Sequence, residues 1–122
     1  MDVYVVGIDI GGTKIATVGA RRDGKILKKI RKPTEAEKGP QHAVQLLREM
    51  VDETIQLAGL RRENILGIGV SCGGPLDTKT GIVYSPPNLP GWDAVPLKEL
   101  IEAEFHVPTI IENDANAGAL AE

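Results

Sequence analysis

The segment Asp9-Ile10-Gly11-Gly12-Thr13-Lys14 has residue types suited to binding a phosphate. Two glycines let the backbone pass close to a ligand with its N–H groups pointing outward. Thr13 adds a hydroxyl donor, Lys14 adds a positive charge, and Asp9 is placed to hold Mg²⁺ directly or through water. An ordinary hairpin turn made by Gly11-Gly12 fits the spacing equally well. The carboxylate of Asp9, alone in an apolar strand, favours a functional site because burying an unpaired charge is costly.

A second segment of small residues, Gly73-Gly74-Pro75-Leu76-Asp77, follows a predicted strand over residues 65–71. Small residues at the carboxyl end of a strand leave room for a ligand. A glycine turn leading into a hairpin explains the same residues equally well. The segment alone therefore leaves both interpretations open.

Polar side chains crowd a third segment, Glu112-Asn113-Asp114-Ala115-Asn116, where a predicted strand meets a helix. Capping the helix needs only one of them, and the helix dipole alone would favour Asp114. The surplus of Asn and Glu predicts more than a cap. Together these groups are suited to holding sugar hydroxyls while one carboxylate accepts a proton.

Alternating strand and helix patterns must position these segments. Apolar and β-branched runs predict strands over residues 3–10, 14–20, 25–31, 65–71 and 107–112, and part of a hairpin over 80–84. Helical spacing predicts helices from Pro40 to Gly59, from Pro96 through Phe105, and from Asp114, capped by Asn113, to the end. The order βββαβαβα, opening with an antiparallel meander, predicts an α/β fold with a mixed sheet flanked by helices.

Composition excludes several classes of protein. The 122 residues suit one domain, and 42% apolar with 25% charged residues is typical of a globular protein. A net charge of −3 without a basic cluster predicts no nucleic-acid partner. Apolar runs stay below the roughly 18 residues of a membrane span, and no signal peptide is recognisable, so we expect no membrane partner and a cytoplasmic location. The single cysteine, Cys72, fits a reducing compartment and is expected to pack rather than react.

Read in order along the chain, the motifs resemble the ROK family of sugar kinases and sugar-responsive repressors. The matching residues are Asp9–Lys14, Gly69–Asp77, Ser85–Trp92 and Glu112–Ala117. The resemblance implies a ribonuclease H-like, actin-like ATPase lobe. It also implies that residues 1–122 are the N-terminal lobe of a two-lobed sugar kinase whose C-terminal lobe is absent from this chain. The final helix reaches Glu122 without a stop signal, which agrees with that expectation.

The implied substrates are ATP with Mg²⁺ and a small sugar. The resemblance assigns the ATP phosphates to Gly11, Gly12, Thr13 and Lys14, and Mg²⁺ to Asp9. It assigns the sugar to Gly74, Asn88, Asn113 and Asp114, with Asp114 as the general base on the attacking hydroxyl. Trp92 is expected to pack its own loop rather than line the sugar site.

Departures from the family pattern limit what residues 1–122 do alone. The family's second lobe carries the adenosine pocket, further sugar contacts and a His/Cys zinc site, so we expect no zinc here and negligible kinase activity. Glucose, phosphorylated at its 6-hydroxyl, is the favoured substrate, with fructose, mannose, allose and N-acetylmannosamine open. A sugar-responsive repressor is the alternative, disfavoured because Met1 leads straight into a strand and the phosphate loop is intact. A binding-only role describes the isolated chain, and a homo-oligomer of the complete protein stays open.

Overall fold

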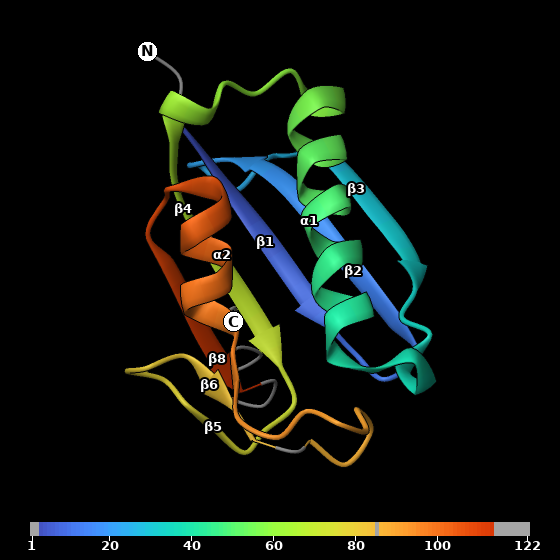
Figure 1. Ribbon diagram of the computed structural model, residues 1–122. Helices are drawn as coiled ribbons and strands as arrows, with labels where there is room; N and C mark the ends of the chain where they lie inside the picture. Colours follow the sequence, from blue (N-terminus) through green and yellow to red (C-terminus); the bar gives the residue numbers. More distant parts are fainter. Residues whose placement is uncertain (1–2, 85, 114–122) are drawn as a thin grey trace.

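The computed structural model describes residues 3–84 and 86–113, and its main feature is a five-stranded sheet in the order β3-β2-β1-β4-β8 (Figure 1). Its strands are β1 (Tyr4–Ile10), β2 (Lys14–Arg21), β3 (Ile26–Pro33), β4 (Ile65–Cys72) and β8 (Thr109–Asn113). The first three pair antiparallel, while β4 runs parallel to both β1 and β8. The predicted meander and mixed sheet are confirmed.

Two strands differ from the prediction by two residues at one end, while β1, β2 and β4 agree with it to within one residue. β3 was expected over residues 25–31 but runs from Ile26 to Pro33, because β2 offers pairing partners as far as Lys14. β8 was expected over residues 107–112 but runs from Thr109 to Asn113, where Cys72 at the end of β4 pairs with Asn113. Both strands therefore reach the edge of the sheet where the segments singled out for phosphate and sugar binding lie.

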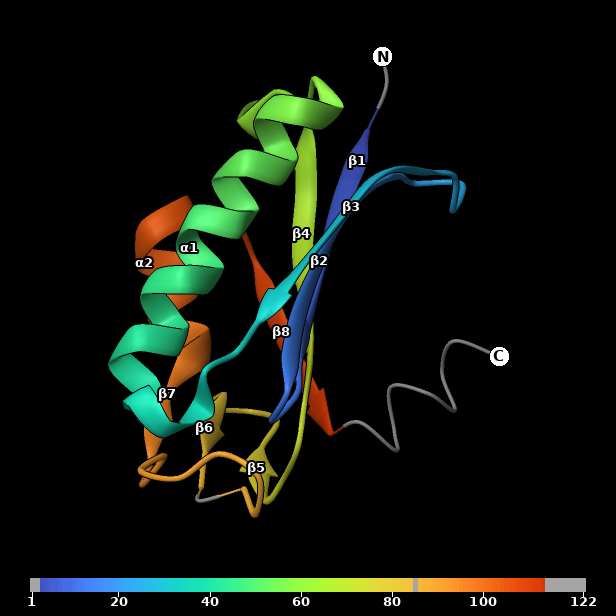
Figure 2. The ribbon, with the colours of Figure 1, turned by 90° about the vertical axis from the view of Figure 1, so that its right-hand side faces the viewer.

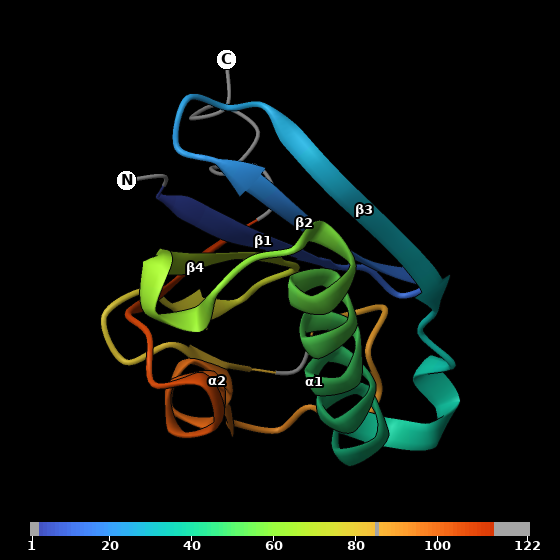
Figure 3. The same ribbon diagram turned by 90° about the horizontal axis from the view of Figure 1, so that it is seen from above.

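Two helices cover one face of this sheet (Figures 2 and 3): α1 (Gly39–Ala58) and α2 (Leu97–Phe105). Gly59 ends α1 in the left-handed region, with φ 71°, and the N–H of Leu60 donates to the carbonyl of Ile55. Short 3₁₀ turns, η1 (Ala36–Lys38) and η2 (Arg62–Asn64), precede α1 and β4. Neither described helix is long and apolar enough to cross a membrane.

A second, small sheet lies below the carboxyl ends of the parallel strands (Figure 1). It consists of β5 (Leu76–Asp77), β6 (Ile82–Val83) and β7 (Val95–Pro96), with β6 in the middle. The sequence predicted only part of a hairpin over residues 80–84. The additional strand β7 directly precedes α2, so this sheet connects the glycine-rich second segment to the second helix.

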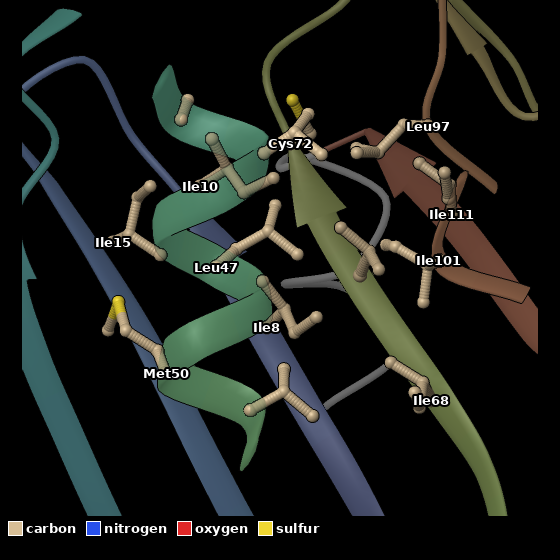
Figure 4. Close-up of a cluster of buried hydrophobic side chains, with 14 of the residues drawn as sticks. Ile8, Ile10, Ile15, Leu47, Met50, Ile68, Cys72, Leu97, Ile101 and Ile111 are labelled. Carbon is tan, nitrogen blue, oxygen red and sulfur yellow. The ribbon is translucent and has the colours of Figure 1, made fainter. Parts of the chain in front are cut away.

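Side chains from the sheet and both helices form one buried cluster (Figure 4). Leu47 and Met50 of α1 and Leu97 of α2 are fully buried against the covered face of the sheet. Cys72 is also fully buried in this cluster, which confirms its predicted packing role. The core thus joins the strands of the sheet to the two helices.

No described helix or strand covers the opposite face of the sheet (Figure 2). Large apolar side chains remain exposed there, including Leu66 at 51% and Ile110 at 65%. Gly7 of β1 and Gly69 of β4 pair with each other in register, which leaves a hollow along the middle of this face. We refer to it below as the open face.

Candidate active site

The three segments singled out from the sequence, residues 9–14, 73–77 and 112–116, meet at one edge of the sheet in their described parts. Parallel strands end on the same side, and Ile10, Cys72 and Asn113 are register neighbours at the ends of β1, β4 and β8. The small sheet lies below this edge (Figure 1). Ligands of open α/β sheets bind outside the carboxyl ends of the strands. Segments distant in sequence therefore converge where that rule places a ligand.

One residue before these ends, Asp9, Ser71 and Glu112 lie side by side across the sheet. Together with Lys14 and Arg31 they line a depression of about 670 Å³ on the open face. The described residues hold no group of three or more side chains that would ligate a metal alone. Mg²⁺ is commonly bound by one or two carboxylates plus phosphate oxygens and water, so this donor set suits an ion delivered with a phosphate.

The predicted phosphate loop is a tight turn held from two directions. The N–H of Gly11 donates to the carbonyl of Lys14 at 3.0 Å. The hydroxyl of Thr34 donates to the carbonyl of Gly11 at 2.7 Å, and the N–H of Thr34 donates to the carbonyl of Thr13 at 2.9 Å. No described group accepts a hydrogen bond from the N–H of Gly12 or of Thr13. Two neighbouring amides are thus available for an anion.

The sequence analysis did not identify Thr34, which lies in none of the three segments that it singled out. A single threonine following Pro33 carries no pattern that marks it as part of a site. The only available signal was its position, directly after a strand that pairs with the strand leaving the loop. The prediction needed the correct end of β3 before it could identify this residue.

Gly12 lies directly against residues 86–92, a loop with three prolines that is called the proline-rich loop below. A Cβ placed on Gly12 would come within 2.6 Å of the Cβ of Asn88 and 2.8 Å of its carbonyl oxygen. Asn88 was predicted as a sugar contact and Gly12 as a phosphate contact. The structure brings the two residues into van der Waals contact, with Asn88 still exposed to solvent.

Gly74 has a similar relation to Asn113. A Cβ on Gly74 would collide with the side-chain amide nitrogen of Asn113, so this glycine makes room for that amide. The two predicted sugar contacts are therefore neighbours at the ends of β4 and β8. Asp114, the predicted general base, lies outside the described residues, as does the helix predicted to follow it.

Two further residues of the predicted segments have structural explanations. Oδ1 of Asp77 accepts from the N–H groups of Lys79 and Thr80, at 2.8 and 3.2 Å. These backbone hydrogen bonds, with Thr80 contributing most, lower the pKa of Asp77 below its ordinary value. Trp92 is 1% exposed, which confirms that it packs its loop. Asp77 thus stabilises the turn that follows β5, and we assign neither side chain a role in the site.

A family model described as the ROK family matches residues 5–122. The chain belongs to the ROK family. Its curated relatives include a glucokinase of Halalkalibacterium halodurans, 32% identical over 99% of this chain. They also include a putative xylose repressor of Caldicellulosiruptor sp., 34% identical over 97% of the chain. The chain spans only 36% of that glucokinase and 29% of that repressor.

Solved ROK structures share the fold. The ROK hexokinase from Thermus thermophilus superposes with a TM-score of 0.84 at 37% identity, with 100% of this chain and 38% of that one covered. A ROK glucokinase from Streptomyces griseus, in complex with glucose and AMPPNP, gives 0.82 at 31% identity, covering 95% of this chain and 35% of that one. The predicted actin-like ATPase lobe is confirmed. Because ROK relatives include both kinases and repressors, membership alone does not choose between them.

Proposed function

We propose that the complete protein is an ATP-dependent hexose kinase and that residues 1–122 are its N-terminal lobe. The observation that carries the proposal is the convergence of an intact phosphate loop and Asp9 with Asn88, Gly74 and Asn113 at one edge of the sheet. Phosphoryl transfer needs little covalent chemistry from the protein. It needs positioning, charge neutralisation and a group that accepts the nucleophile's proton.

The nucleotide half of the site is built from the phosphate loop. No described group accepts a hydrogen bond from the N–H of Gly12 or of Thr13, and Lys14 adds a positive charge at the start of β2. With Gly11, these residues would hold the phosphates of ATP. Asp9 would bind the accompanying Mg²⁺, which neutralises charge on the phosphates when bound.

The sugar half would be formed by Gly74, Asn88 and Asn113, whose backbone and amide groups suit hydroxyl recognition. Asp114 follows Asn113 directly, and we assign it the role of general base. Glucose is our favoured acceptor, through its 6-hydroxyl. Its support is the glucokinase relative and the glucose and AMPPNP bound in the Streptomyces griseus glucokinase.

A sugar-responsive repressor is the second candidate, favoured by the identity to the putative xylose repressor. A repressor needs the sugar pocket but not phosphoryl transfer. In this chain Asp9, the two glycines, Thr13 and Lys14 are all present. The retained phosphate chemistry therefore favours the kinase.

The first experiment measures ADP release by the complete protein with ATP and Mg²⁺, over a panel of hexoses and N-acetylhexosamines. We expect release with glucose or another hexose of the panel. Release with one sugar names the substrate and selects the kinase over the repressor. A folded protein that binds a sugar but releases no ADP with any of them would favour the repressor.

Asp114→Asn in the complete protein tests the proposed base. The substitution keeps the shape and removes the proton acceptor, so kcat should fall by about 10²-fold or more while sugar binding is largely retained. Asp23→Asn is the matched control, because Asp23 lies in the exposed turn between β2 and β3. Equal kcat in both variants would remove Asp114 from this role.

A further inference from the structure

Thr34 is a buried residue that contacts the phosphate loop but belongs to none of the three segments singled out from the sequence. It follows the last residue of β3 and is 0% exposed. Its hydroxyl donates to the carbonyl of Gly11 at 2.7 Å, and its own N–H donates to the carbonyl of Thr13 at 2.9 Å. One residue thus binds the turn on both sides of Gly12.

The bond to the carbonyl of Gly11 determines where the next N–H points. A peptide unit is planar and trans, so the carbonyl of Gly11 and the N–H of Gly12 point in opposite directions. Glycine backbones rotate easily, and this peptide lies between two of them. Holding the carbonyl toward the buried Thr34 hydroxyl therefore holds the N–H of Gly12 outward.

We propose that the Thr34 hydroxyl is a positioning group that orients the Gly11–Gly12 peptide toward the phosphate of the nucleotide. The inference rests on the proposed function, because that function supplies the phosphate. Thr34 touches neither substrate in this arrangement. It acts by fixing one donor of the loop before the nucleotide arrives, which reduces the ordering that binding must supply.

The two hydrogen bonds of Thr34 allow orientation to be separated from general stability. Side-chain substitution removes the hydroxyl bond and leaves the backbone N–H to Thr13 in place. Thr17 offers a matched control, since it is also 0% exposed and its hydroxyl pairs with that of Thr54 at 2.7 Å. Thr17 lies on β2, where it bonds to α1 rather than to the loop.

The experiment compares Thr34→Val, Thr34→Ala, Thr34→Ser and Thr17→Val in the complete protein. Steady-state kinetics give kcat and the KM values for ATP and sugar, and calorimetry with Mg²⁺ and a non-hydrolysable ATP analogue gives the nucleotide Kd. Thermal unfolding reports the stability of each variant. Thr34→Ala removes the hydroxyl without placing a methyl group against the carbonyl of Gly11, so it provides the comparison if the Val variant does not fold.

We expect Thr34→Val and Thr34→Ala to raise the nucleotide Kd and the KM for ATP about five- to tenfold, the range of one hydrogen bond. The KM for sugar should stay within about twofold of wild type. Thr34→Ser keeps the hydroxyl and should restore most of the nucleotide affinity. Thr17→Val should lower stability with unchanged nucleotide affinity.

Unchanged nucleotide Kd in a folded hydroxyl-free variant would overturn the inference. So would equal weakening of sugar and nucleotide, or the failure of both hydroxyl-free variants to fold, because the hydroxyl would then serve the fold. A wild-type protein that binds the analogue but phosphorylates no sugar would contradict the proposed function while the Thr34 comparison still stands. Wild-type protein that binds no nucleotide would overturn both.

Discussion

At the scale of single residues, position 12 requires glycine because there is no space for a side chain. A Cβ there would meet the backbone carbonyl and Cβ of Asn88, which cannot turn aside as the end of a flexible side chain would. Gly74 differs, because its added Cβ would meet the movable amide of Asn113. The phosphate loop and the proline-rich loop are therefore fitted together at the level of the main chain.

Gly12→Ala should destabilise the 122-residue chain by about 1–3 kcal/mol, the usual cost of overpacking. Gly69→Ala is the control, since a Cβ on Gly69 meets no described atom within 4 Å. Replacing a glycine within a strand should leave stability equal or raise it by about 0.5–1 kcal/mol. Urea unfolding measures both, and equal stability of the two variants would refute the close contact at Gly12.

Asp77 should make a small pH-dependent contribution to stability. Its pKa is lowered in the folded chain by the N–H groups of Thr80 and Lys79, so its contribution is full above the ordinary value of about 3.9. The contribution is lost as pH falls through the lowered pKa. Asp77→Asn keeps the acceptor oxygen without the charge, so its melting temperature should approach that of wild type as the pH falls below the lowered pKa. A difference in melting temperature between the variant and wild type that grows as the pH falls would contradict this assignment.

Residue types identified part of the site from sequence. Asp9 stood out as the charge in an apolar strand, and the structure places it beside Ser71 and Glu112. The contacts of Gly12 with Asn88 and of Gly74 with Asn113 join residues far apart in the chain, so no local pattern could have indicated them. Thr34 was missed for the same reason.

Helix α1 shows how an element holds the site in place. Its buried residues face the sheet: Ala43, Val44, Leu47, Met50, Val51, Thr54 and Ile55. The hydroxyl of Thr54 meets that of Thr17 on β2. The helix therefore packs on β2 and its neighbour β3.

Leu47→Ala should cost about 2–5 kcal/mol, because Leu47 is fully buried and its loss leaves a cavity. Leu57→Ala is the matched control on the same helix, with Leu57 56% exposed. It should change stability by no more than about 0.5 kcal/mol. Urea unfolding of both variants tests the prediction, which fails if the two costs are similar.

At the element level, long periodic segments were predictable and very short ones were not. The helical spacing of apolar residues and the terminal Gly59 predicted α1 to within one residue at its start. The strands β5, β6 and β7 have two residues each, too few for an alternating pattern to appear. Their pairing depends on chain segments that α2 and the parallel strands bring together.

Residues 3–84 and 86–113 form a two-layer unit with helices on one side of the main sheet and the open face on the other (Figure 2). The depression beside Asp9 opens on that face. Since the chain spans about a third of its relatives' length, we infer that the complete site needs residues beyond these 122. Sequence patterns predicted this architecture because apolar residues follow one another in the strands of the sheet and recur at helical spacing in the helices.

Residues 1–122 alone should therefore show negligible ATP-dependent phosphorylation of any hexose. A coupled ADP assay on the isolated chain, beside the complete protein at equal concentration, makes the comparison. The positive control is the complete protein with its preferred sugar. Turnover by the isolated chain near the rate of the complete protein would show that one lobe suffices.

The contact of Gly12 with Asn88 has a thermodynamic consequence. The phosphate loop and the proline-rich loop are in direct contact at Gly12 and Asn88, so a movement of one loop toward the other would displace it. If one loop binds a nucleotide and the other a sugar, each ligand pre-orders the loop that receives its partner. Linkage requires such a coupling free energy to be reciprocal. Bound sugar would then raise the affinity for nucleotide by the same factor by which bound nucleotide raises the affinity for sugar.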